Sequence, residues 1–194
     1  LLSHLKWDRK VIWSNRNMGN VICLSDQISD PKNFLFSMNN GLTDVFINVL
    51  LLSGSQLAKD ENEKRLIVWL AERDQSAVGM GTVGFSVLEM PWNITTFEKD
   101  QAFMLKAIEH ARNGIGWKQL DYVPSEDLLF PALNQFYFLI AQLKRSDIKP
   151  DSLEEWLAEA AENDPVRCGF PRCSRHYALL TTFGCQICNN EVLR

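Results

Sequence analysis

The chain has 194 residues and a formal net charge of −4, with 46% hydrophobic and 23% charged residues. This composition matches an average soluble globular protein and excludes a disordered, collagen-like or low-complexity chain. The length fits one domain with a small appendage, and a chain of this size buries roughly 70% of its unfolded surface, so it needs no disulfides. The acidic balance argues against a surface covered with nucleic-acid-binding basic residues.

The N-terminal part of the chain predicts a mixture of strands and helices. Residues 10–14 and 20–24 are β-branched and apolar on either side of a turn-rich stretch, which predicts a β-hairpin. Asp30 followed by Pro31 is typical of a helix start and predicts a helix to residue 38, ended by residues 39–41.

The next segment predicts a helix followed by two strands. Residues 43–52 form an apolar run that predicts a helix, stopped by the Ser-Gly pair at 53–54. Residues 59–64 predict a charged loop. Residues 65–71 are rich in strand-forming side chains and predict a buried strand, with residues 84–90 as its neighbour.

The second half of the chain is predicted to be mostly helical. Capping-box patterns at 95–98 and 152–155 predict two helix starts, the second for a short helix that ends before Pro165. Residues 117–122 predict a strand. A further helix follows from apolar residues at steps of three and four: Leu129, Leu133, Phe136, Ile140 and Leu143. We therefore expect an α+β fold in which a small sheet packs with several helices, plus a C-terminal zinc-binding module.

The charge changes sign towards the C-terminus. Residues 147–165 carry seven acidic residues against one lysine, whereas residues 166–194 carry four arginines against one glutamate. We interpret this change as a boundary. The predicted organisation is an α+β body at 1–146, an acidic helix or linker at 147–165 and a zinc-binding module at 166–194.

The strongest functional signal is a cluster of cysteines near the C-terminus. Cys173 and His176, and then Cys185 and Cys188, are two pairs of ligand residues that are each separated by two positions. Such spacing lets a tight turn direct both side chains at one ion, and two turns complete a tetrahedron suited to Zn²⁺. Cys168 is an alternative ligand, so five candidates compete for four places.

Residues 168–190 resemble the zinc knuckles of ribbon and treble-clef modules, and the resemblance is confined to this segment. Because all four ligand positions are filled by protein, we expect a structural zinc ion rather than a catalytic one. Between the ligand pairs lie three apolar residues: Leu179, Leu180 and Phe183. We expect these to pack on the body or on another protein chain, while Arg172 and Arg175 stay in solvent.

No catalytic residue is predicted. Residues 79–84 match G-x-G-x-x-G, but no strand directly precedes them and no helix is predicted after them, so they indicate a glycine-rich turn. His110 has no recognisable nucleophile beside it, and Glu72 with Asp74 indicates a solvated loop.

The expected function is that of a non-enzymatic acidic protein-interaction module with a structural zinc site, such as an inhibitor or immunity-type protein that binds a basic partner. Two alternatives stay open: a zinc-containing nucleic-acid-binding or regulatory accessory protein, and an enzyme with a site assembled from scattered residues. The longest apolar run, residues 45–52, is interrupted by Asn48 and is too short to cross a bilayer, and no secretory signal is visible. We therefore expect a cytoplasmic protein without membrane contact.

Overall fold

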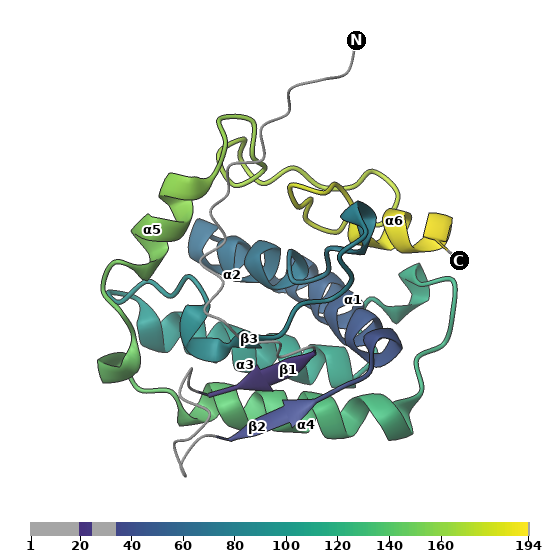
Figure 1. Cartoon of the computed structure of the whole chain (residues 1–194), viewed down its shortest axis with the longest axis horizontal. Helices are drawn as coiled ribbons and strands as arrows, with labels where there is room; N and C mark the ends of the chain where they lie inside the picture. Colours follow the sequence, from purple (N-terminus) through teal and green to yellow (C-terminus); the bar gives the residue numbers. More distant parts are fainter. Residues whose placement is uncertain (1–19, 25–33, 194) are drawn as a thin grey trace.

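The computed structural model describes residues 20–24 and 34–193, in which a small sheet lies at one side of a group of helices (Figure 1). The helices of these ranges are α1 (Asn40–Leu57), α2 (Glu61–Ala71), α3 (Phe97–Arg112), α4 (Glu126–Gln142), α5 (Ser152–Glu159) and α6 (Gln186–Leu193). The strands are β1 (Val21–Cys23), β2 (Leu35–Ser37) and β3 (Phe85–Ser86). The predicted α+β fold class and its small sheet are confirmed. No helix in the described ranges is long and apolar enough to cross a membrane.

Helix α1 is the centre of the hydrophobic core, and it packs against α2, α3 and α4. A Cβ atom added at Gly54 would lie 2.2 Å from Cδ1 of Ile67, so α1 and α2 approach closely at this glycine. The Ser-Gly pair therefore does not stop the helix, contrary to the sequence prediction, because the missing side chain is what allows the two helices to pack.

The sheet has the order β2-β1-β3, with β1 antiparallel to β2 and parallel to β3. Ile22 pairs with Phe36 on one side and with Phe85 on the other, so both edges of β1 are occupied. The predicted partner strand at residues 10–14 lies outside the described residues, and the structure gives its place beside β1 to other strands.

The predicted helix up to residue 38 is wrong in its described part, because residues 35–37 form β2. Phe36 is buried while Leu35 and Ser37 are exposed, which is the alternation of a half-buried strand. Residues 39–41 start a helix rather than end one: Asn39 caps α1 by accepting a 2.8 Å hydrogen bond from the Leu42 N–H.

The predicted buried strand at 65–71 is helical and belongs to α2. Asp60 and Glu63 form a capping box at its start, so most of the predicted charged loop is the first turn of this helix. Leu66 to Ala71 are all buried. A short run of consecutive apolar residues shows neither helical nor strand periodicity. The prediction therefore rested on composition alone, which favoured a strand where the chain forms a helix.

Two further predicted strands are short or absent. Residues 117–119 form a 3-10 turn in the place of the strand expected at 117–122. Of residues 84–90, only Phe85 and Ser86 form a strand, and a 3-10 turn follows them. Side-chain type alone therefore overestimated the extent of the sheet, whose strands are set by tertiary packing.

The helices predicted for the second half are confirmed as α3, α4 and α5. The predicted capping boxes are absent. The N-cap residues are Thr96 and Asp151, and neither side chain forms a capping hydrogen bond. Residues 79–84 form no helix and contain left-handed backbone at Gly79 and Gly81, in agreement with the predicted glycine-rich turn. The division into a body at 1–146, a linker and a C-terminal module stays a prediction.

Candidate metal centre

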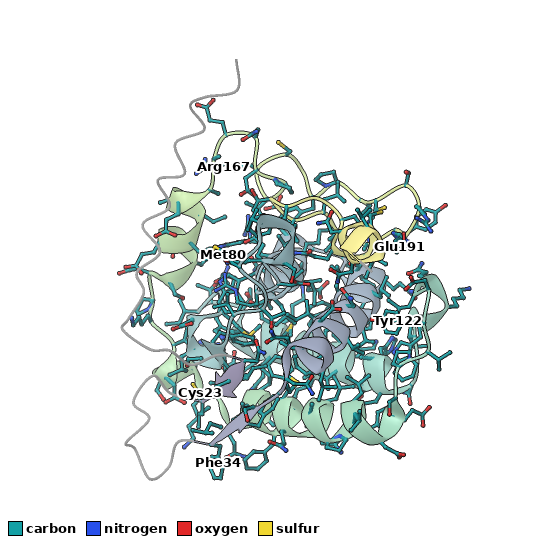
Figure 2. The ribbon with its side chains drawn as sticks, turned by 45° about the vertical axis from the view of Figure 1, so that its right-hand side comes forward. Cys23, Phe34, Met80, Tyr122, Arg167 and Glu191 are labelled. Carbon is teal, nitrogen blue, oxygen red and sulfur yellow. The ribbon has the colours of Figure 1, made fainter. Side chains whose placement is uncertain are left out.

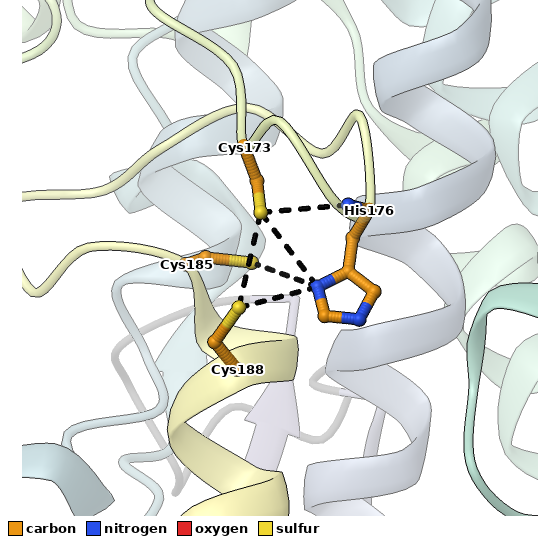
Figure 3. Close-up of side chains that lie close together, drawn as sticks. All are labelled: Cys173, His176, Cys185 and Cys188. Atoms are coloured by element: carbon orange, nitrogen blue, oxygen red, sulfur yellow. Dashed lines mark hydrogen bonds between the residues drawn. The ribbon is translucent and has the colours of Figure 1, made fainter.

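Four predicted ligands come together at the C-terminal end of the chain (Figure 3). The donor atoms of Cys173, His176, Cys185 and Cys188 all lie within 4.8 Å of one another. Cys168 is exposed, and it lies outside this group with its Sγ 3.9 Å from the Glu162 carbonyl. The structure therefore separates the alternative ligand from the other four.

The first ligand pair is held by a tight loop. Hydrogen bonds of 2.9 Å join the Tyr177 N–H to the Cys173 carbonyl, and the Cys173 N–H to the Ala178 carbonyl. Tyr177 has a left-handed backbone with φ of 56°, which turns the chain sharply after the pair. The His176 N–H lies 3.4 Å from the Cys173 Sγ and donates to it. This closed loop directs the thiol and the imidazole towards one point.

The second ligand pair stands at the start of α6. A turn between Thr181 and Gly184 is closed by two backbone hydrogen bonds of 2.9 Å, and Gly184 has φ of 88°. Cys185 follows this turn, and Cys188 lies three positions later on α6. Residues three apart share one face of a helix, so both thiols face the loop that carries the first pair.

The distances between donor atoms match a tetrahedral metal site. His176 Nδ1 lies 3.7 Å from Cys173 Sγ, 3.6 Å from Cys185 Sγ and 3.3 Å from Cys188 Sγ. Cys173 Sγ and Cys188 Sγ are 3.8 Å apart. A tetrahedron with Zn–S of about 2.3 Å and Zn–N of about 2.0 Å has edges of about 3.8 Å between sulfurs and about 3.5 Å from sulfur to nitrogen. The residues thus fit a metal ion of this size.

The three thiols differ in their ease of ionisation. Burial raises the pKa of Cys185 to about 12 and also raises the pKa of Cys188. Burial acts in the same direction on Cys173, but hydrogen bonds from the His176 and Arg175 backbone outweigh it and lower its pKa to about 6. Three ionised thiolates in this space need a cation to balance them, which a divalent metal supplies.

A carboxylate lies behind the imidazole. His176 is 3% exposed, and its Nε2 lies 3.4 Å from Oε1 of Glu191 on α6. Glu191 also forms an ion pair with Arg175. A carboxylate at the outer nitrogen of a ligating histidine fixes the proton there and leaves the inner nitrogen free to bind metal. Nδ1 is therefore the donor atom of His176.

The loop of the first pair is tied to helix α1. The Leu179 N–H donates to Ser55 Oγ over 2.9 Å, and Arg172 Nη1 donates to the Ser55 carbonyl over 2.7 Å. Leu179 is fully buried and Leu180 packs partly against the core, as expected, and Phe183 is half-buried. Arg172 and Arg175 are exposed, as expected, but the Arg172 guanidinium also binds two backbone carbonyls, and its partial burial lowers its pKa.

Helix α6 is held by buried polar groups that the sequence analysis missed or misread. Gln186 Nε2 donates to the carbonyls of Ala71 and Asp74 over 3.1 and 2.7 Å. Asn190 Nδ2 lies 3.4 Å from Asp74 Oδ2 and also bonds to Asp44. Asp74 and the nearby Glu72 are 0% and 2% exposed, so the prediction that they lie in a solvated loop is wrong. Their spacing gives no signal of burial, because their partners come from distant segments.

The remaining sequence candidate does not join a site. His110 is half-buried on α3, and its Nδ1 finds no hydrogen-bond partner among the described residues. In the same ranges, no second group of three or more His, Cys, Asp or Glu side chains is arranged to hold a metal. Comparison with known proteins finds no matching family model, no matching curated protein and no matching solved structure.

Proposed function

We propose that Cys173, His176, Cys185 and Cys188 bind one structural Zn²⁺ ion in a module of the treble-clef kind. Support comes from the donor distances and from the arrangement of the two pairs, one in a tight loop and one at the start of α6. Three thiols and an imidazole are the donor set that zinc prefers, and four protein ligands leave no position for a substrate.

We infer that the chain as a whole is a non-enzymatic protein-interaction module that binds a basic partner through α5. The observation that carries this proposal is a group of exposed carboxylates on residues 151–162: Asp151, Glu154, Glu155, Glu159 and Glu162. None of these side chains forms an ion pair within the described residues, whereas other exposed acids do, such as Glu98 with Arg145.

The acidic segment also presents an aromatic side chain. Trp156 is half-buried on α5, and its Nε1 has no acceptor among the described residues. Tryptophan beside unpaired charge is typical of a protein-binding surface, where the aromatic group supplies affinity and the charges supply orientation and speed of association.

The arginines of the C-terminal segment support a protein partner over nucleic acid. Arg172 binds the Ser55 and Tyr177 carbonyls, Arg175 pairs with Glu191, and Arg167 Nη2 donates to the Leu157 carbonyl over 2.6 Å. Binding of phosphate would have to compete with these contacts. The arginines of the described residues 166–193 therefore form no free cationic stripe of the kind that a nucleic-acid interface uses.

The test is a matched pair of charge reversals, titrated with a fluorescent lysine-rich peptide. Glu159→Lys changes the last residue of α5, and Glu109→Lys changes an equally exposed glutamate in the last turn of α3. Each raises the net charge by the same amount near a helix C-terminus. We expect about fivefold weaker peptide binding for Glu159→Lys and little change for Glu109→Lys, measured by anisotropy.

The same titration has outcomes that contradict the proposal. Equal weakening by both variants shows that only the net charge matters, and α5 is then not the docking site. Tighter binding of a DNA duplex than of the peptide, with a steep dependence on salt, replaces the protein partner with nucleic acid.

A further inference from the structure

Three exposed apolar side chains gather beside strand β2, on a surface that the proposed function does not use. Phe34, Leu35 and Phe138 are 51%, 47% and 43% exposed. The rings of Phe34 and Phe138 meet edge to face with centroids 5.1 Å apart. They line a groove of about 230 Å³ between β2 and α4, and Phe34 stands at the periphery of the molecule (Figure 2).

Strand β2 is also the edge of the sheet in the described residues. The Leu24 N–H donates to the Phe34 carbonyl and the Met38 N–H to the Asn20 carbonyl, so residues 34, 36 and 38 bond towards β1. In an antiparallel pair these bonds alternate along the strand. The N–H and C=O groups of Leu35 and Ser37 are therefore directed away from β1, along the outer side of β2.

The two described segments that flank this groove carry no charge. Residues 34–43 and residues 128–143 contain no Asp, Glu, Lys or Arg, although 23% of the whole chain is charged. The exposed side chains of the second range are apolar or amide groups, such as Asn134 and Gln135 beside the groove. Depletion of charge with exposed aromatic groups is the composition of an interface core, and natural edge strands are normally guarded by lysine, proline or a bulge.

We propose that this surface binds a second copy of the chain, with β2 pairing antiparallel to β2 of the other copy. A two-fold axis brings the same strand against itself in opposite directions, so Leu35 and Ser37 of each copy receive matching donors and acceptors. Phe34 and Phe138 of each copy then pack against the α4 surface of the other. The sheets of the two copies join into one.

Electrostatics favours a second copy over a charged partner. Each copy carries a net charge of −4, so two copies repel each other except where the meeting surfaces are neutral. Under a two-fold axis, a charge near the axis faces its own copy, and a neutral surface avoids that penalty. A basic or acidic partner finds no complementary charge in these two ranges. The acidic α5 is left for other partners.

The test measures the molar mass of the zinc-loaded protein by sedimentation equilibrium at micromolar protein concentrations. We expect the wild type to approach twice the mass of one chain as its concentration rises. Leu35→Lys and Phe138→Lys place a charge on the neutral surface, and each should weaken self-association at least tenfold. Val192→Lys is the matched control, because Val192 is 84% exposed on α6, far from β2 in Figure 1, and it should leave the dimer intact.

A second readout keeps the result independent of folding. Hydrogen exchange at the Leu35 and Ser37 amides should slow as the wild-type concentration rises, while zinc content and circular dichroism stay the same in all variants. A wild type that keeps the mass of one chain throughout overturns the proposal. A dimer that survives both lysine variants overturns it too, because the interface then lies elsewhere.

Discussion

The helices around α1 and the segment after residue 165 are stabilised in different ways. Helix α1 buries Phe46 and most residues that follow it against three neighbouring helices, so apolar contact holds this region. In residues 166–193 the regular structure is a single short helix, α6, and isolated bridges. A segment this small has little apolar area of its own, so the proposed metal ion would supply folding free energy that a core supplies elsewhere.

Polar bonds as well as apolar contacts join the C-terminal segment to the helices. Helices α1 to α4 meet mainly through apolar side chains, with a few polar bonds such as that from Ser53 Oγ to the Ala107 carbonyl. The C-terminal segment adds polar anchors to α1 and α2, among them Ser55 to Leu179 and Gln186 to Ala71. Leu179 and Ile187 still join the common core. Polar anchors fix orientation, because each one requires a particular donor and acceptor geometry. The metal site is thus held at a defined place against α1.

The largest effect should come from removing a metal ligand. Cys185→Ser is expected to lower zinc content from about one equivalent to near zero and to unfold residues 166–193, because structural zinc supplies about 10 kcal/mol or more to its module. Helices α1 to α4 should persist, since apolar contacts hold them. Metal analysis and limited proteolysis measure the two effects.

Cys168→Ser is the matched control for this prediction, because Cys168 is an exposed thiol outside the donor group. It should keep full zinc content and the wild-type proteolysis pattern. Loss of zinc in Cys168→Ser, or a wild type that purifies under reducing conditions without metal, contradicts the proposed ligand set.

A smaller effect in the opposite region should follow from Gly54→Ala. The added Cβ would lie 2.2 Å from Cδ1 of Ile67, so α1 and α2 must move apart, at a cost of about 1–3 kcal/mol in the free energy of unfolding. Zinc content should not change. Denaturant unfolding measures the difference, with Gly41→Ala as control, because a Cβ there meets nothing closer than 3.7 Å. A Gly54→Ala variant as stable as the wild type, or more stable, would contradict the prediction, because the higher helix propensity of alanine would then outweigh the close contact.

The smallest effect concerns a buried charge among the helices. Burial raises the pKa of Asp100 from its ordinary value of 3.8 to about 6 in the folded protein. The folded state therefore binds the proton more tightly than the unfolded state. The contribution of this group to stability is fully present below about pH 4 and is lost as the pH rises through about 6.

Asp100→Asn should remove this pH dependence and raise the free energy of unfolding at pH 8 by about 1 kcal/mol. Denaturant unfolding at pH 5 and pH 8 measures it. The Thr96 hydroxyl donates to Asp100 over 2.9 Å, and Asn keeps an acceptor for that bond. A variant that is less stable than the wild type at pH 8 would show that the carboxylate stabilises the start of α3 more than its burial costs.

Local patterns predicted part of the fold and most of the metal centre. Helices α3 and α4 follow from apolar spacing of three and four, and the short α5 is predicted from its Ser-x-x-Glu start; a single segment displays each of these patterns by itself. The four ligands follow from two pairs with two-residue gaps, because a tight turn brings such pairs together without help from the rest of the chain. By sequence, Cys168 is also a candidate ligand, and only its position in the structure excludes it from the group of donors.

The sequence by itself therefore determined these helices and the two ligand pairs, because each is encoded within a few neighbouring residues. The tertiary structure decided what depends on distant partners. Residues 65–71 are helical where α2 packs against α1 and α3, and residues 35–37 form a strand because β1 lies beside them. The burial of Asp74 depends on Asn190 and Gln186, more than 110 positions away, whose side chains come close only when α6 folds against the helices.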